Sequence, residues 1–140
     1  ALRAIAKFTR IRRVIEFGGG VYSTKLFLDR AAFPDLESLV TVEHNEDWLE
    51  LLTTGDARHR VIIADHDSAI KETSSMSADL VFVDSTTNRS ELVAHGITIA
   101  AIVGQHDCAK IGGYTYEKAF NSKIQTVFVS NTIDLSEMTL

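Results

Sequence analysis

The stretch that decides the fold covers residues 13–24 and reads RVIEFGGGVYST. Its first five residues form an apolar, β-branched run, which is typical of a buried strand. Gly18, Gly19 and Gly20 follow at once, and a stretch that can form a helix comes next. Glycines between a strand and a helix allow a tight turn and a close approach of the backbone to a ligand, while the helix start offers free N–H groups. We therefore expect a ligand at this turn, bound also by the first residues of the helix, Tyr22, Ser23 and Thr24.

Working outward from this turn, the same alternation of strand and helix recurs along the chain. Further buried-strand runs cover residues 39–43, 60–64, 79–84, 97–103 and 124–130. Helix candidates lie near residues 22–31, 46–52, 66–72, 89–94 and 114–120. Strands that alternate with helices predict an α/β fold, a doubly wound, Rossmann-like sheet that is mostly parallel and has helices on both faces.

The end of the chain breaks this alternation. The run at residues 124–130 is followed, after a short turn at Asn131, by residues 132–140, which leaves no space for a helix. A parallel crossover needs about a dozen residues or more, so two segments joined this tightly must be antiparallel. We therefore expect the sheet to end in a hairpin, with the last strand antiparallel.

Length and composition narrow the class of protein. The 140 residues suffice for one core, so we expect a single domain over residues 1–140 and exclude a two-domain dehydrogenase. The longest nearly apolar run, residues 97–104, is far below the ~20 residues that cross a bilayer, which predicts no membrane association. Cys108 is the only cysteine, which fits a reducing, cytoplasmic location.

Charge is unevenly distributed along the chain. Residues 1–13 hold five basic side chains and no acid, and we expect residues 1–12 to form a basic N-terminal helix. The rest of the chain carries all 19 acidic residues and has a net negative charge, which disfavours binding to a nucleic-acid backbone.

Ligands of open α/β sheets bind at the carboxyl ends of the strands, so the residues there are the candidate site. Glu16 precedes the first glycine by two residues, where a carboxylate repels a pyrophosphate but can receive a ligand ammonium group. Glu43 ends the second run, 23 residues after Gly20, where an acid can accept hydrogen bonds from both hydroxyls of a ribose. His44 beside it is a candidate to cover the adenosine. NAD and S-adenosylmethionine both present that ribose, whereas Glu16 favours S-adenosylmethionine.

The third and fourth strand ends supply further candidates. Asp65 or His66 is placed to contact an adenine amino group, and Asp67 is the candidate cap of the next helix. Asp84 ends the fourth run, and Arg89, a few residues later, can pair with it or hold an anionic substrate.

The fifth strand end brings candidates for catalysis. His106 has the side chain whose ordinary pKa suits proton removal near neutrality, and Asp84 or Asp107 can orient it. We assign these three residues as catalytic candidates and expect no metal site. Tyr114 and Tyr116 lie on the following loop and are candidates for substrate binding.

Taken together, EFGGGVYST, LVTVEHNEDWLELL, DLVFVDSTTNR and IVGQHD resemble the class I S-adenosylmethionine-dependent methyltransferase superfamily over essentially the whole chain. The resemblance implies a seven-stranded sheet with an antiparallel last strand. It also implies that Glu16, Gly18 and Gly20 approach the amino-acid end of the cofactor and that Glu43 holds its ribose. Val21 and Tyr22 stand before Ser23 like an insertion, which departs from the superfamily pattern.

The resulting hypothesis is a methyltransferase that transfers a methyl group from S-adenosylmethionine to an oxygen or nitrogen of a small molecule, with S-adenosylhomocysteine as product. Two alternatives stay open: a module that binds the cofactor without catalysis of its own, and an NAD-binding domain. A homo-oligomer also stays open. The cofactor-binding sheet uses nearly all residues, so we expect specificity to come from residues 1–13 and from the loop at residues 107–116.

Overall fold

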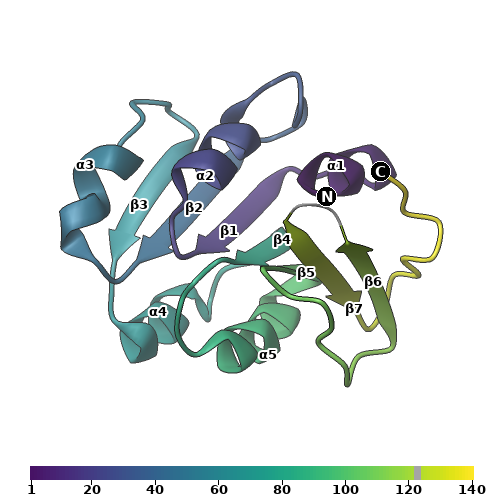
Figure 1. Ribbon diagram of the computed structural model, residues 1–140. Helices are drawn as coiled ribbons and strands as arrows, with labels where there is room; N and C mark the ends of the chain where they lie inside the picture. The colour runs from purple at the N-terminus through teal and green to yellow at the C-terminus, as the bar shows by residue number, and fades with distance from the viewer. Residues whose placement is uncertain (122–123) are drawn as a thin grey trace.

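Figure 1 shows the computed structural model of the chain, which describes residues 1–121 and 124–140. Its elements, in chain order, are α1 (Leu2–Phe8), β1 (Arg13–Phe17), α2 (Val21–Leu28), β2 (Ser38–Glu43), the 3₁₀ helix η1 (Glu46–Trp48), α3 (Leu49–Leu52), β3 (His59–Ile63), α4 (His66–Thr73), β4 (Ala78–Val83), α5 (Arg89–Ile99), β5 (Ala100–His106), β6 (Tyr116–Asn121) and β7 (Gln125–Ser130).

The strands form one seven-stranded sheet in the order β3-β2-β1-β4-β5-β7-β6. The neighbours from β3 to β5 pair in parallel, whereas β7 is antiparallel to both β5 and β6. The expected mostly parallel, seven-stranded sheet with an antiparallel last strand is thus confirmed. The order of strands reverses between β1 and β4, so the carboxyl ends of these two strands border the crevice in which open sheets bind ligands.

Helices cover both faces of the sheet, as Figure 1 shows, with α1 and α2 on one face and α4 and α5 on the other. Alternate residues of the inner strands β2, β1, β4, β5 and β7 supply the two cores. Phe27 of α2 packs on the first face with Phe82 and Phe128, and all three side chains are at most 1% exposed. Val93 of α5 packs on the second face with Val81 and other valines of the sheet. Burial on both faces explains why the strands read as nearly continuous apolar runs.

The prediction for the end of the chain is wrong in its details. Residues 114–120, expected as a helix, contribute strand β6, and residues 132–140, expected as a strand, form neither a helix nor a strand. The hairpin therefore joins β6 to β7. Ser130 turns the chain after β7, because its hydroxyl oxygen accepts hydrogen bonds from the backbone N–H groups of Thr132 and Ile133. The tail then buries Leu135 and Met138 in the core on the α1 side.

The boundary before β5 is also wrong in the prediction. Residues 97–99 are β-branched, which favours a strand, but they extend helix α5, and β5 begins at Ala100. Gly96 explains the difference, because a Cβ atom there would lie 2.8 Å from the Val81 side chain. Close packing of the helix on the sheet thus overrides the local preference for a strand.

At its amino end, the chain forms a shorter helix than the one expected over residues 1–12. Helix α1 ends at Phe8, and residues 9–12 lead into β1. Within the described residues, no helix is both long enough and apolar enough to span a membrane.

Candidate functional site

The glycine turn is packed between the ends of β2 and β4. Gly18 has φ of +82°, and a Cβ atom there would lie only 2.6 Å from the backbone nitrogen of Ser85, so a side chain at this position cannot fit. Its N–H donates to the carbonyl oxygen of Val42 at 2.8 Å. Gly20 faces a cavity, and a Cβ atom there would lie 3.1 Å from Oδ2 of Asp84. The missing side chain at Gly20 thus leaves room for a ligand between the turn and Asp84.

Glu43 holds the turn from the β2 side. Its Oε2 accepts a hydrogen bond from the N–H of Gly19 at 2.8 Å, and its Oε1 accepts from the N–H groups of His44 and Asn45 at 3.1 Å each. The Nδ1 atom of His44 lies 3.2 Å from Oε1. A carboxylate has about four acceptor positions, so Glu43 retains capacity on Oε2 for a ligand hydroxyl.

Glu16 lies beneath the turn, on the α2 side of β1, and is fully buried. Three hydroxyl groups donate to its carboxylate: those of Ser23, Thr24 at 2.7 Å and Thr41 at 2.9 Å. Burial raises the pKa of Glu16 to about 7, while the three hydroxyl groups oppose this shift and the charge of Asp84 adds to it. In this structure Glu16 therefore holds the first turn of α2 to the sheet and is not open to either cavity described below.

Neither Ser23 nor Thr24 caps α2. The N-cap residue is Gly20, whose side-chain position is empty, and both hydroxyl groups point back to Glu16 instead. Thr41 was missed by the sequence analysis. The sequence does mark Thr41 as unusual, because it is a polar residue within the apolar run of β2. In the sheet it lies directly opposite Glu16.

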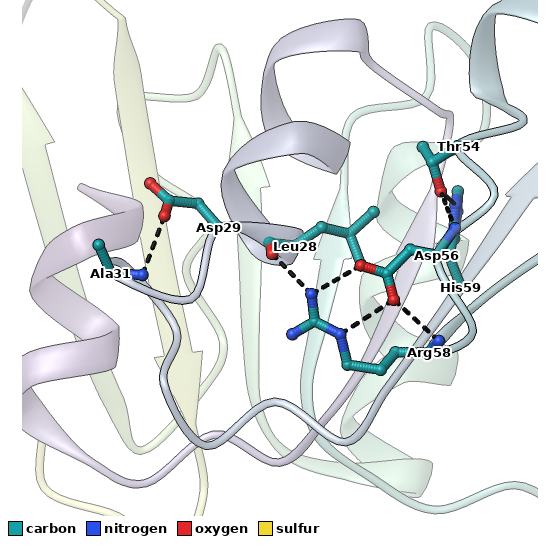
Figure 2. Close-up of polar contacts among 7 residues, drawn as sticks. All are labelled: Leu28, Asp29, Ala31, Thr54, Asp56, Arg58 and His59. Atoms are coloured by element: carbon teal, nitrogen blue, oxygen red, sulfur yellow. Dashed lines mark hydrogen bonds and ion pairs between the residues drawn. The ribbon is translucent and has the colours of Figure 1, made fainter.

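A chain of hydrogen bonds leads from Glu16 toward the surface. The hydroxyl of Thr41, which donates to Glu16, also lies 2.9 Å from Nε2 of His59. Figure 2 shows the next contact, in which Nδ1 of His59 lies 2.9 Å from the hydroxyl of Thr54. Burial lowers the pKa of His59, which favours the neutral imidazole. The consistent arrangement is then a proton on Nε2 that is donated to Thr41, while Nδ1 accepts from Thr54.

Arg58, next to His59, fastens the far end of α2 (Figure 2). Its Nη2 donates to the carbonyl oxygen of Leu28, the last residue of α2, at 2.7 Å, and its Nε and Nη2 bind the Asp56 carboxylate at 3.0 and 2.7 Å. The guanidinium group holds the pKa of Asp56 well below its ordinary value. A cation at a helix C-terminus stabilises the last carbonyl groups. Both ends of α2 are thus fixed, which positions the glycine turn.

Asp84, His106 and Asp107 lie together where β4 and β5 end. Nδ1 of His106 is 3.2 Å from Oδ1 of Asp84, and Nε2 is 3.1 Å from Oδ1 of Asp107. The side chains of Asp84 and His106 are 21% and 22% exposed, whereas that of Asp107 is 67% exposed. Burial raises the pKa of Asp84, and the charges of His106 and Arg89 oppose that shift. The three catalytic candidates are therefore in contact, with Asp84 as the more buried partner of the imidazole.

Arg89 joins the same two strand ends through their backbones. Its Nε donates to the carbonyl oxygen of Ser85 at 2.5 Å, and its Nη1 donates to that of His106 at 2.8 Å. These bonds hold the loop after β4 against the end of β5. The guanidinium group thus positions Asp84 and His106 relative to each other.

A small cavity of about 170 Å³ lies on one side of the glycine turn, at the ends of β1, β2 and β3. Gly18, His44, Asp65 and His66 line it, together with Ser85, a residue that the sequence analysis missed. Asp65, and not Asp67, caps α4, because its Oδ1 accepts from the N–H of Ser68 at 2.8 Å. His66 is held by Glu91, whose Oε2 lies 2.7 Å from Nε2.

A larger cavity of about 590 Å³ lies on the other side of the turn, and the two cavities share no lining residue. Gly20, Tyr22, Asp84 and His106 form its end at the glycine turn. The other described residues that line it come mainly from α1, α2, β4 and β7: Ala1, Leu2, Arg3, Ala4, Lys7, Ser23, Leu26, Phe82, Ile124, Thr126 and Leu140. The sequence did not predict which residues of α1 line this cavity, nor that Phe82 and Thr126 do, because the lining depends on how distant elements pack.

The remaining substrate-binding candidates lie elsewhere. Arg89, Tyr114 and Tyr116 line neither cavity. Tyr116 packs from β6 against the core on the α1 side, and Tyr114 packs against the core on the other face. Among the residues that the structure describes, no three His, Cys, Asp or Glu side chains converge to hold a metal ion.

Comparison with known proteins gives matches in structure and none in sequence. No protein-family model matches the sequence, and no curated protein matches it. A spermidine synthase in complex with the transition-state analogue AdoDATO has a TM-score of 0.70 and 14% identity, over 97% of this chain and 58% of that chain. Cofactor-bound Rv0187 from MTB has a TM-score of 0.69 and 18% identity, over 93% of this chain and 78% of that one. The O-methyltransferase TomG from Streptomyces achromogenes, in complex with SAM, has a TM-score of 0.67 and 16% identity, over 92% and 77%.

The chain has the class I methyltransferase fold. An antiparallel β7 inserted between β5 and β6 at the edge of a parallel sheet is the strand order of this fold. The chain spans 58% of the length of the spermidine synthase chain, which is less than two thirds. The candidate residues all lie at the carboxyl ends of parallel strands: the glycine turn at β1, Glu43 at β2, Asp84 at β4 and His106 at β5.

Proposed function

We propose that the chain binds S-adenosylmethionine at the carboxyl ends of β1 to β4 and transfers its methyl group to an oxygen or nitrogen of a small molecule. The observation that carries this proposal is the glycine turn with a cavity on each side, where Glu43 holds one side and Asp84 and His106 form the other. TomG, which shares the fold, is an O-methyltransferase solved in complex with SAM, which supports the choice of cofactor.

The residues present fit this cofactor in three places. The small cavity, with Asp65 and His66, suits the adenine. Glu43 lines neither cavity but precedes His44 of this lining, and it has a free acceptor position for the ribose. Gly20 leaves room for the amino-acid part next to Asp84, whose carboxylate can receive the ammonium group. Glu16 supports this arrangement from below by holding Ser23 and Thr24.

The cofactor supplies an electrophilic methyl group when it is bound, and it leaves as S-adenosylhomocysteine. His106 takes the proton that the acceptor oxygen or nitrogen loses as its new bond to carbon forms. Asp84 accepts from Nδ1–H of the imidazole, which leaves Nε2, 3.1 Å from Oδ1 of exposed Asp107, to receive that proton. Arg89 positions the two strand ends that carry this pair.

Replacing His106 with glutamine is expected to lower the rate of methyl transfer by about 10²- to 10⁴-fold, the usual contribution of a general base. The affinity for S-adenosylhomocysteine should stay within about twofold, since the imidazole acts on the acceptor. Transfer is measured with methyl-labelled S-adenosylmethionine and a panel of phenols, hydroxy acids and amines. Asp107→Asn is the matched control, because Asp107 contacts the same imidazole but is 67% exposed, and a small loss is expected there.

Two outcomes would contradict parts of this assignment. An unchanged rate in His106→Gln would remove the imidazole from the mechanism. Binding of S-adenosylhomocysteine without transfer to any acceptor of the panel would favour a cofactor-binding module that lacks catalysis of its own.

A further inference from the structure

The lining of the larger cavity points to the chemistry of the acceptor. We infer that this cavity takes a mostly apolar acceptor that carries a carboxylate, with the carboxylate at Arg3 and Lys7 and the nucleophile at His106. The inference rests on the proposed function, because it assigns the substrate class of the same site. Each part of the acceptor corresponds to a separate part of the lining.

The cationic part comes from α1. Arg3 and Lys7 both line the cavity, and a spacing of four residues places them on the same face of the helix. Arg3 contacts Asp29 only loosely, with 3.8 Å between Nη2 and Oδ2 and with both side chains more than 40% exposed. Such a pair contributes little, so Arg3 can turn to a ligand anion at small cost. Lys7 has no ion pair within the described residues.

The apolar part lies next to these cations. Leu2 and Ala4 of α1 and Leu26 of α2 line the cavity and are at most 9% exposed. Phe82 of β4 is 1% exposed and leads to the reacting end, with its ring 6.3 Å from that of His106. A volume of about 590 Å³ holds a small organic molecule and is within the usual range for such pockets.

The charges of the cavity favour an anion at α1 and a neutral group at the other end. Among the described side chains that line it, Arg3 and Lys7 are the cationic ones, and Asp84 is the acidic one. Asp84 faces the imidazole of His106. The rest of the chain is acidic, so α1 is where an anionic ligand finds an attractive field.

The test compares matched acceptors on the protein loaded with S-adenosylhomocysteine. The probes are 4-hydroxyphenyl alkanoic acids of increasing chain length, each with its neutral amide of the same size. We expect at least one acid to bind about tenfold or more tightly than its amide, and rising salt should reduce the difference. Where transfer occurs, the double variant Arg3→Gln/Lys7→Gln should raise KM for the acid and leave kcat little changed, because a contact to the carboxylate is the same in the ground state and in the transition state.

Arg10→Gln/Arg13→Gln is the control, since it removes the same charge from the same segment at residues that do not line the cavity. It should leave the preference for acids intact. Equal binding of acids and amides, or no binding of any acid, would overturn the inference while binding of S-adenosylhomocysteine still supports the proposed function. A loss of S-adenosylhomocysteine affinity in Arg3→Gln/Lys7→Gln would assign the cations to the cofactor carboxylate and would also overturn it.

Discussion

Replacement of Glu43 with alanine is expected to weaken the binding of S-adenosylhomocysteine by about 10- to 10²-fold. The free Oε2 position is the proposed acceptor for a ribose hydroxyl, and a hydrogen bond to a charged group contributes about 1.5–3 kcal/mol. The substitution also removes the acceptor of the Gly19 N–H, which lies 2.8 Å from Oε2, so the turn itself loses a contact. Binding is measured by isothermal titration calorimetry.

Two further variants separate these effects. Glu43→Gln keeps one carbonyl acceptor and should retain part of the affinity. Glu46→Ala removes an exposed acid only three residues away and should leave the affinity unchanged. If Glu43→Ala binds S-adenosylhomocysteine as tightly as the natural sequence does, Glu43 does not hold the ribose.

Glu16 should make the stability of the fold depend on pH in an unusual direction. Its pKa is about 7 in the folded chain, whereas the ordinary value, taken for the unfolded chain, is 4.5. Between pH 4.5 and about 7 the folded protein therefore binds more protons than the unfolded chain. The contribution of Glu16 to the free energy of unfolding should therefore be largest below pH 4.5 and should fall as pH rises through about 7. A shift of this size corresponds to about 3 kcal/mol.

The variant Glu16→Gln should remove most of this decrease, because glutamine does not titrate and still offers a carbonyl acceptor to the hydroxyl groups. Urea unfolding at a series of pH values from 4.5 to 8 measures it. Glu37→Gln is the matched control, since Glu37 is an exposed acid whose side chain pairs with Arg12 at the surface. The burial of Glu16 would be refuted by a pH dependence that is the same in Glu16→Gln and in the natural sequence.

Most of the fold is readable from residue patterns. The apolar runs that are buried on both faces identify β1, β2 and β4, because full burial requires continuous apolar sequence. The prediction fails where packing between distant segments decides. Tyr116–Asn121 alternates exposed side chains with part-buried or buried ones at the edge of the sheet, and its pairing with β7 makes it a strand. The tail after Ser130 pairs with no strand of the described residues and instead packs Leu135 and Met138 into the core.

The site is predictable where local order along the chain suffices. Glycines after β1 and acids after β2 and β4 appear at the strand ends, since the ends of parallel strands meet at one edge of the sheet. The roles of single residues need the three-dimensional structure. Glu16 is one case, because only the packing of α2 shows that Ser23, Thr24 and Thr41 already occupy its carboxylate. Arg3 and Lys7 of α1 are another, because only the folded chain shows that they line the same cavity as Asp84 and His106.

The central claim is that the edge of the sheet around the glycine turn binds S-adenosylmethionine and its product. Calorimetric titration of the natural sequence with S-adenosylhomocysteine, with NADH in parallel, tests it most directly. The account predicts saturable binding of S-adenosylhomocysteine with one site per chain and no comparable response to NADH. The claim would be contradicted if S-adenosylhomocysteine at millimolar concentration gave no heat of binding and no chemical-shift change. A rise in melting temperature with NADH alone would also contradict it.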